Sequence, residues 1–268
     1  FASGLAYYLR FILYAFSYIP LSNIFNRNQS NNLITALAIM FPMLGIVQYI
    51  WFPDLRPFII YGWDEHYLRV FGTILDPNFF GLILIWSLLN LKNIYYWSLG
   101  FLVFCFTYSR SSFLSFLTSF GFWNLKIGKL FGFLGFGFLV IVSLWLLPRP
   151  DGEGVRLERT ASITARTANI EYAWGIIKDH PISGVGFNLL KGNYANIDNS
   201  FLFITATSGF IGLALYLNFL FNLWQKIKSY PKLAAFFLAI LVHSLFNNSQ
   251  FFTPVILLFS LSTAAKKL

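Results

Sequence analysis

Long apolar runs separated by short polar gaps make up most of this 268-residue chain. The runs are continuous and do not alternate at every second position, which is typical of helices rather than of membrane-barrel strands. A helix needs about 20 apolar residues to cross a bilayer, and fewer where it is tilted or flanked by aromatic residues. The pattern predicts nine spans, near residues 3–21, 33–53, 78–91, 94–108, 110–124, 130–147, 200–224, 233–249 and 251–265. We therefore expect an all-α fold, a polytopic transmembrane helical bundle, with residues 1–268 as a single transmembrane domain.

Charge divides the polar gaps into two kinds. All ten carboxylates fall within residues 54–76 and 151–198, whereas the other gaps carry only Lys and Arg. Cytoplasmic loops of membrane proteins keep an excess of Lys and Arg, so the two acidic stretches are predicted to face outwards. The second stretch belongs to a long extracytoplasmic loop, residues 148–199, inserted between spans and expected to contain amphipathic helices.

Composition excludes two broad classes of protein. With 57% hydrophobic and 11% charged residues, the chain is too apolar for a soluble domain, in which about a quarter of residues are charged. The net charge of +9 is scattered between apolar runs and forms no basic face, which argues against nucleic-acid binding. The single cysteine and three histidines have no metal-like spacing. Because the chain begins at Phe1 inside an apolar run, we expect an N-terminally truncated piece of a longer protein.

The long loop is predicted to contain a helix from Ser162 to Lys178 with an apolar stripe. The stripe repeats at intervals of three and four residues and consists of Ile163, Ile170, Ala173, Trp174 and Ile177. Arg166 falls on the same stripe, where a cation needs an anionic partner or ligand to offset its desolvation. The alternatives are a snorkelling side chain or an internal pair with Glu158 or Glu171.

Two further polar segments follow this helix. Residues 181–188 contain a Gly-x-Gly sequence without a preceding strand, which favours a close-packed turn over a phosphate loop. Asp198-Asn199-Ser200 stands directly before an apolar run, and each of the three residue types is a common helix N-cap. Since one cap suffices, Asp198 is also a candidate functional residue at the membrane face.

Two histidines receive different interpretations. His243 lies inside an apolar span, where ionisable residues are functional candidates, although an interhelical hydrogen bond is the alternative. His66 follows two acidic residues and is expected to belong to a solvated loop.

The order of several motifs resembles the O-antigen ligase/polymerase superfamily. The long loop and the following helix carry Arg166…Trp174…His180-Pro181-x-x-Gly184-x-Gly186-Phe187…Asp198-Asn199-Ser200 and then Gly209-Phe210-Ile211-Gly212-Leu213. Upstream stretches agree in order, namely Arg69-x-x-Gly72-Thr73-x-x-Asp76-Pro77-Asn78-x-x-Gly81 and Thr107-Tyr108-Ser109-Arg110-Ser111. The resemblance covers about residues 65–225.

The resemblance implies a membrane glycosyltransferase of the GT-C-like type that needs no metal or other cofactor. Such an enzyme moves a glycan from undecaprenyl diphosphate to an acceptor hydroxyl, outside the bacterial cytoplasmic (inner) membrane. The acceptor is a lipid A core sugar for a ligase of lipopolysaccharide biosynthesis, or another glycan for a polysaccharide polymerase of the cell envelope. The expected partners are therefore the lipid-linked glycan donor, the glycan or lipid A core acceptor and membrane lipid.

Catalytic residues carry over by position. The family's catalytic arginines fall on Arg110 and Arg166, and its catalytic histidine falls on Asp198. An Asp-Asn-Ser sequence at this place is similar to many polymerases, whereas ligases are associated with His. The predicted catalytic set is Arg110, Arg166 and Asp198, and the predicted substrate-binding set is Arg69, Asn78, Asn199 and His243.

The chemistry of these side chains suits glycan transfer. Arginine forks bind phosphate bidentately and stay charged, so Arg110 and Arg166 would stabilise a departing diphosphate. Asp198 would accept the proton of the acceptor hydroxyl or orient that hydroxyl. The alternative function is a multi-span transporter of a lipid-linked or anionic solute, against which stands the lack of paired Gly- or Pro-broken spans.

Overall fold

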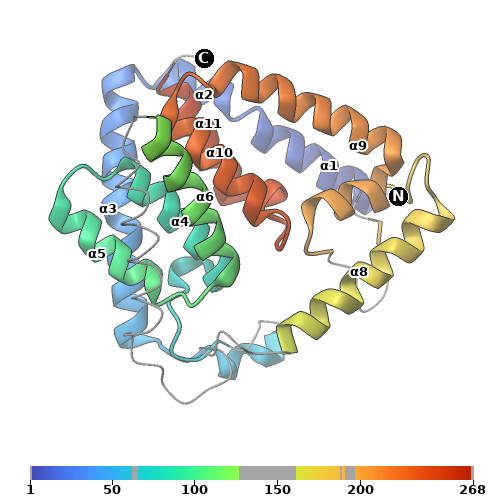
Figure 1. Ribbon diagram of the computed structural model, residues 1–268, viewed down its shortest axis with the longest axis horizontal. Coiled ribbons are helices and arrows are strands. Elements are labelled where there is room, and N and C mark those ends of the chain that lie inside the picture. Colours follow the sequence, from blue (N-terminus) through green and yellow to red (C-terminus); the bar gives the residue numbers. More distant parts are fainter. Residues whose placement is uncertain (1, 62–65, 127–160, 188, 191–196, 267–268) are drawn as a thin grey trace. The chain divides into compact units, whose positions relative to one another are not determined.

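The computed structural model (Figure 1) describes residues 2–61, 66–126, 161–187, 189–190 and 197–266. Within these residues the regular structure is helical, apart from one isolated antiparallel bridge between Asp54 and Tyr67, which confirms the all-α prediction. The chain divides into two compact units, each taken by itself below. The predicted span 130–147 and the first part of the long loop lie outside the described residues.

One unit comprises residues 28–159 and 231–243 and is built around α4. Its helices are α3 (Arg27–Trp51), η1 (Arg56–Tyr61), η2 (Gly72–Ile74), α4 (Pro77–Asn90), α5 (Ile94–Cys105), α6 (Arg110–Lys126) and α10 (Pro231–His243). Helix α4 packs against α5, α6 and α10, and α10 also packs along α6. Eleven of the 14 residues of α4 are buried. A helix that is apolar on every side belongs in the centre of a bundle, which is where α4 lies.

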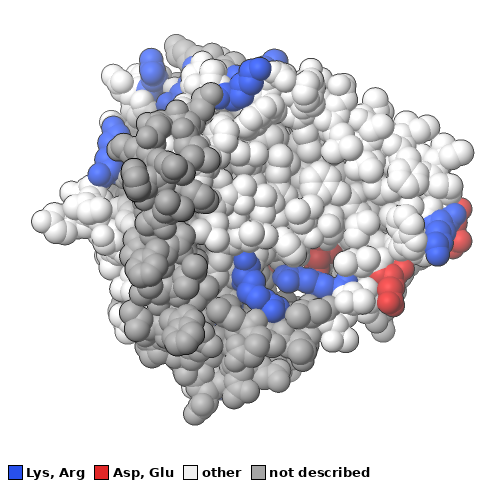
Figure 2. Space-filling model, viewed as in Figure 1, with Lys and Arg blue, Asp and Glu red and all other residues white. Residues whose placement is uncertain are grey.

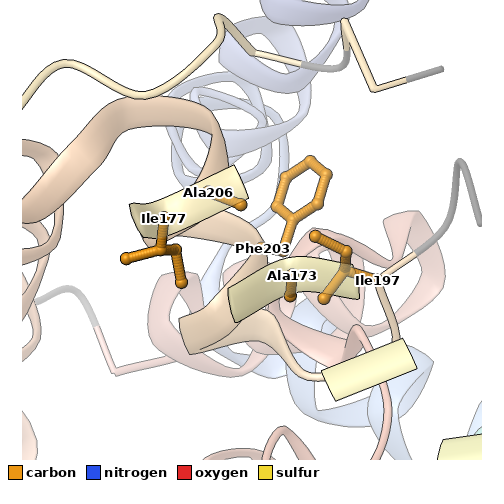
Figure 3. Close-up of a cluster of buried hydrophobic side chains, with 5 residues drawn as sticks. All are labelled: Ala173, Ile177, Ile197, Phe203 and Ala206. Carbon is orange, nitrogen blue, oxygen red and sulfur yellow. The ribbon is translucent and has the colours of Figure 1, made fainter. Parts of the chain in front are cut away.

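The other unit comprises residues 1–27, 160–230 and 244–268. Its helices are α1 (Ala2–Ala15), α2 (Tyr18–Ile24), α8 (Ala161–Asp179), α9 (Ser200–Ile227), η4 (Ser249–Phe251) and α11 (Thr253–Ala264). Helix α8 packs against α9, and α11 packs against both α1 and α2. Figure 3 shows the buried cluster where α8 meets α9, made of Ala173, Ile177, Ile197, Phe203 and Ala206.

The loop helix was predicted well, but its buried face is narrower than expected. Helix α8 extends one residue beyond the predicted limits at each end. Ala173 and Ile177 are buried, as expected, whereas Ile170 and Trp174 are about half exposed. The expectation that these two side chains are buried is wrong because α9 covers only the side of α8 that carries Ala173 and Ile177.

Two predicted spans are shortened in the structure for identifiable reasons. The span predicted at 3–21 is broken between α1 and α2, since Pro20 has no N–H to donate to the carbonyl of Phe16. That carbonyl accepts from the backbone N–H of Ile19 at 3.0 Å instead. The span predicted at 233–249 ends at His243 because the next carbonyls, of Ser244 and Leu245, accept hydrogen bonds from the start of α9.

Helix α9 is interrupted at Gly209, whose φ of 67° and ψ of −174° are not helical. The turn that follows α8 fills the interruption. The N–H groups of Val185 and Gly186 donate to the carbonyls of Ala206 and Thr207, at 3.0 and 2.8 Å. In return, the N–H of Phe210 donates to the carbonyl of Pro181 at 2.8 Å. The Gly-x-Gly segment is thus a packing turn, as expected, and it supplies the hydrogen bonds that a continuous helix would have made internally.

Two of the described helices, α3 and α9, are long and apolar enough to cross a membrane. Helices α4, α5, α10 and α11 are apolar but shorter. Figure 2 shows that most of the described surface on one face carries no charge, with Lys and Arg confined to a few places. An uncharged exterior of this kind suits contact with lipid.

Candidate active site

The candidate site residues fall into two groups, one in each unit. In the unit built around α4, Arg110 is the first residue of α6 and is half-buried. Ser109 caps this helix end by accepting the N–H of Ser112 on its hydroxyl at 3.3 Å. The first turn of α6 contains no acidic residue, so the guanidinium adds to the positive end of the helix dipole. This end of α6 therefore favours an anion.

A buried arginine holds the turn that precedes Arg110. Arg69 is 2% exposed, and its Nε donates to the carbonyl of Thr107 at 2.9 Å. Its Nη2 lies 3.5 Å from the carbonyl of Tyr108. Tyr108 has a φ of 48°, a left-handed conformation that is unfavourable for a bulky side chain. Arg69 therefore fixes the backbone that presents Arg110, and its direct contact with substrate stays a prediction.

The loop that carries Arg69 is itself fixed by two buried side chains. Gln48, in the last turn of α3, accepts the N–H groups of Phe71 and Gly72 on its Oε1 at 2.9 and 3.1 Å. His66 is 6% exposed, and its Nδ1 lies 3.4 Å from Nη1 of Arg69. The solvated-loop interpretation of His66 is therefore wrong, because the ring packs against this arginine. Gln48 was missed, although a lone amide in an apolar run was a usable signal.

Hydroxyl groups connect Arg110's neighbours to Asn78 and His243. Ser109 donates to Oδ1 of Asn78 at 2.8 Å, and the hydroxyl of Ser112 donates to that of Ser109 at 2.9 Å. Nε2 of the fully buried His243 lies 3.3 Å from both Ser111 and Ser112. The interhelical hydrogen bond that was the alternative for His243 is therefore present, and both Asn78 and His243 position the start of α6, while their contact with substrate stays a prediction.

Asn78 owes its place to the start of α4. Asp76 caps that helix by accepting the N–H groups of Asn78 and Phe79, at 2.6 and 3.1 Å, and Pro77 occupies the first turn. Proline is favoured at this position because its missing N–H would have no helical partner. The Asp-Pro-Asn sequence is thus a helix-start motif that aims Asn78 at Ser109.

In the other unit, Arg166 and Asp198 approach the same end of the α8–α9 pair. The backbone N–H of Asp198 donates to Oδ1 of Asn169 at 3.4 Å. Asn169 lies one helical turn after Arg166, on the same side of α8. The guanidinium carbon of the half-buried Arg166 lies 5.8 Å from the ring centroid of Phe246, within cation–π range.

The α9 cap is Asn199. Its Oδ1 accepts the N–H groups of Phe201 and Leu202 at 2.8 and 3.0 Å, and its Nδ2 donates to the carbonyl of Leu245 at 2.9 Å. The exposed Asp198 is thus not needed to cap the helix. Because Leu245 precedes Phe246, Asn199 also anchors the segment that carries the ring beneath Arg166.

An ion pair outside the candidate site lies in the first acidic stretch, residues 54–76. Arg56 binds Asp54 bidentately, with Nη2 2.7 Å from Oδ2, and stacks on Tyr67 with its guanidinium carbon 4.0 Å from the ring centroid. The hydrogen bond from Arg56 is the main cause that lowers the pKa of Asp54. The pair is largely exposed, so it organises the loop rather than providing a reactive group.

The comparisons with known proteins bear on both groups. Residues 95–217 match a family model described as O-antigen ligase (Wzy_C). The domain over these residues belongs to the O-antigen ligase family. The matched stretch of this O-antigen ligase domain includes Arg110, Arg166, Asp198 and Asn199, whereas Arg69, Asn78 and His243 lie outside it. A search of curated proteins found no significant match.

The family matched by residues 95–217 indicates the general character of this domain. O-antigen ligase family proteins are integral membrane proteins, consistent with the two described helices that are long enough to span. They are enzymes of the ligase or polymerase type that transfer glycans in polysaccharide biosynthesis and act on lipid-linked glycans. The resemblance seen in the sequence motifs is confirmed.

Proposed function

We propose that this protein transfers a glycan from undecaprenyl diphosphate to a sugar hydroxyl, at the extracytoplasmic face of the bacterial cytoplasmic membrane. The observation that carries the proposal is the placement of Arg166 and Asp198, through Asn169 and Phe246, at one end of the α8–α9 pair. A cation for the leaving group and a carboxylate for the acceptor are the two groups that such a transfer requires.

The reaction proceeds as a displacement at the anomeric carbon. The acceptor oxygen forms a bond to that carbon, the bond from the carbon to the diphosphate oxygen breaks, and the diphosphate leaves with the electron pair. Arg166 binds the diphosphate and stabilises the charge that grows on it, without a metal ion, and the same role for Arg110 stays a prediction from the sequence. The proton of the acceptor hydroxyl passes to the carboxylate of Asp198 or, if Asp198 only orients the hydroxyl, to an oxygen of the departing diphosphate.

Asp198 favours a polymerase over a ligase. The residue stands where O-antigen ligases are expected to have His, and the Asp-Asn-Ser sequence is similar to many polymerases. A carboxylate is a weaker base than an imidazole, because its ordinary pKa is lower. Transfer by this enzyme then depends more on stabilisation of the leaving group by arginine than on proton removal.

The test is transfer by the full-length protein in nanodiscs, supplied with the host's own undecaprenyl-diphosphate-linked glycan and with either a glycan or lipid A core acceptor. Arg166→Ala is expected to lower the rate about 10²–10³-fold. Asp198→Ala is expected to lower it about 10²-fold or more if the carboxylate is the base, whereas Asp198→Asn retains most activity if it only orients the acceptor. Chain growth identifies a polymerase and single transfer to lipid A core identifies a ligase.

Two exposed residues provide matched controls, Asp179→Ala at the end of α8 and Arg56→Ala in the first acidic stretch. Both are expected to retain wild-type rates. Full activity of Asp198→Ala would remove Asp198 from the mechanism. A wild-type protein that consumes no donor with any acceptor would contradict the proposal and bring forward a transporter.

A further inference from the structure

Gln250 is a buried side chain whose hydrogen-bonding groups find no partner in the described part of the chain. It is 8% exposed, and neither its Nε2 nor its Oε1 has a hydrogen-bond partner among the described residues. Buried polar groups in native proteins are nearly always hydrogen-bonded, and a burial without partners costs free energy. A carboxamide in this state has both donor and acceptor capacity to offer to a bound molecule.

The backbone of Gln250 is held against the start of α9. Its N–H donates to the hydroxyl of Ser200 at 3.4 Å. The same hydroxyl donates to Oδ1 of Asn248 at 3.0 Å, and the N–H of Ser200 donates to the carbonyl of Ser244 at 3.0 Å. Ser200 follows Asp198 by two residues, so the unused carboxamide belongs to the segment bound to the candidate catalytic end of α9.

The chemistry of the carboxamide selects the kind of ligand. A phosphate offers only acceptors and would leave Oε1 unpaired, whereas neighbouring sugar hydroxyls donate and accept and so match both ends of the amide. Aromatic rings follow directly, because Phe251 lies 5.1 Å from Phe203 and 5.8 Å from Phe187 between ring centroids. An apolar wall with a few polar groups is the usual composition of a small-molecule site.

We propose that the Gln250 carboxamide binds hydroxyl groups of the sugar that is held beside Asp198. Gln250 is a binding residue in this reaction, and it sets which sugar is accepted rather than how fast the bond is made. The inference rests on the proposed glycan transfer. Gln250 is proposed to bind the sugar part of the substrate and not the diphosphate.

The experiment measures binding and transfer separately in the full-length protein. The probe for binding is the repeat oligosaccharide released by mild acid from the host's undecaprenyl diphosphate pool, which carries no diphosphate. Gln250→Met, which keeps the length of the side chain but removes both polar groups, is expected to raise the dissociation constant of this oligosaccharide at least about tenfold. In the transfer assay it is expected to raise KM for the acceptor and leave kcat close to wild type.

Two controls separate recognition from folding. Gln225→Met changes an exposed glutamine on α9 and is expected to bind the oligosaccharide as wild type does. The thermal stability of Gln250→Met is expected to equal or exceed that of wild type, because the substitution breaks no hydrogen bond with a described residue. Binding of inorganic pyrophosphate is expected to stay unchanged in Gln250→Met.

The outcomes distinguish this inference from the proposed function. Oligosaccharide binding that is unaffected by Gln250→Met would overturn the inference. A wild type that binds no oligosaccharide would also overturn it. In both cases an internal water would be the partner of the carboxamide. An equal loss of pyrophosphate binding would overturn it in favour of the diphosphate. If wild type transfers nothing but binds the oligosaccharide through Gln250, the proposed function fails and the sugar-binding role of Gln250 stands.

Discussion

Gly209 lies so close to Ile182 that a Cβ added to the glycine would be 2.0 Å from the carbonyl oxygen of Ile182. The approach is matched from the other side, because a Cβ on Gly184 would be 2.3 Å from the carbonyl carbon of Thr207. Both glycines have positive φ, 67° and 65°. The turn after α8 and the break in α9 are therefore in contact, backbone against backbone, with no room for a side chain.

Gly209→Ala is expected to lower the free energy of unfolding by about 3 kcal/mol, because the conformation is accessible almost only to glycine and the backbone of Ile182 cannot move away cheaply. Gly175→Ala is the matched control. Gly175 lies inside α8 with no atom within 4 Å of an added Cβ, so alanine there is expected to stabilise by about 0.5–1 kcal/mol. The measurement is retention of the monodisperse peak after heating in detergent, and equal behaviour of the two variants would contradict the described packing.

Arg69→Lys is expected to loosen the turn that presents Arg110, since a lysine cannot reach two carbonyls with a planar fork. Leaving the carbonyl of Thr107 unpaired costs about 1–3 kcal/mol. Cys105, the chain's single cysteine, is 1% exposed and precedes Thr107 by two residues. Its rate of labelling by a maleimide dye therefore reports how far this turn is loosened. Labelling is expected to be faster in Arg69→Lys than in wild type.

Arg56→Lys is the control for that labelling experiment. Arg56 belongs to the same loop but forms an exposed ion pair with Asp54, worth about 0–1 kcal/mol. Its substitution is expected to leave Cys105 protected. Rapid labelling in both variants would mean that the loop as a whole, rather than the Arg69 hydrogen bonds, protects the cysteine.

Stability and activity are expected to separate at the start of α9. Asn199→Ala removes the helix cap and should cost about 1 kcal/mol of stability, whereas Asn199→Asp keeps an accepting oxygen and should recover most of it. Asp198→Ala is expected to change stability by less than about 0.5 kcal/mol, as for other exposed positions. Thermal unfolding of the three variants beside their transfer rates tests this, and a large stability loss in Asp198→Ala would make the residue structural.

Gly81 permits the close approach of α4 to the start of α6. A Cβ on Gly81 would lie 2.4 Å from the hydroxyl oxygen of Ser112, so Gly81→Ala is expected to destabilise by about 1–3 kcal/mol through overpacking. Adding Ser112→Gly to Gly81→Ala removes the clashing atoms and should recover part of this loss. The test is a double-mutant cycle on thermal stability, in which strictly additive effects would show that the two residues do not meet.

The helices were predictable where apolar runs are long and proline or glycine marks their ends. Helix α8 and the start of α9 at Ser200 match the sequence prediction because both begin or end at strong local signals. The limits of α1 and α10 were not predictable. The end of α1 depends on which residue before Pro20 leaves the helical conformation. The end of α10 depends on hydrogen bonds that the following carbonyls accept from Asn199 and Ser200, which are distant in sequence.

The candidate site was predictable in its charges but not in its supports. Arg166 and Asp198 stand out as charges beside apolar runs. Three consecutive residues before α9 are possible caps. Hydrogen-bond geometry decides which of them caps the helix, and this geometry cannot be read from a single sequence. Gln48 was overlooked as a partner for the same reason, since an amide's importance depends on what surrounds it after folding.

The interruption at Gly209 also bears on how this protein meets bilayers of different thickness. The part of α9 after the glycine, Phe210–Ile227, contains 18 of its 28 residues and is about 27 Å long, close to the thickness of a hydrocarbon core. The stretch before it, Ser200–Ser208, is held by the turn at 181–187 rather than by the rest of the helix. If Phe210–Ile227 tilts to fit a thinner or thicker bilayer, the residues around Asp198 would therefore keep their contacts with the neighbouring segments.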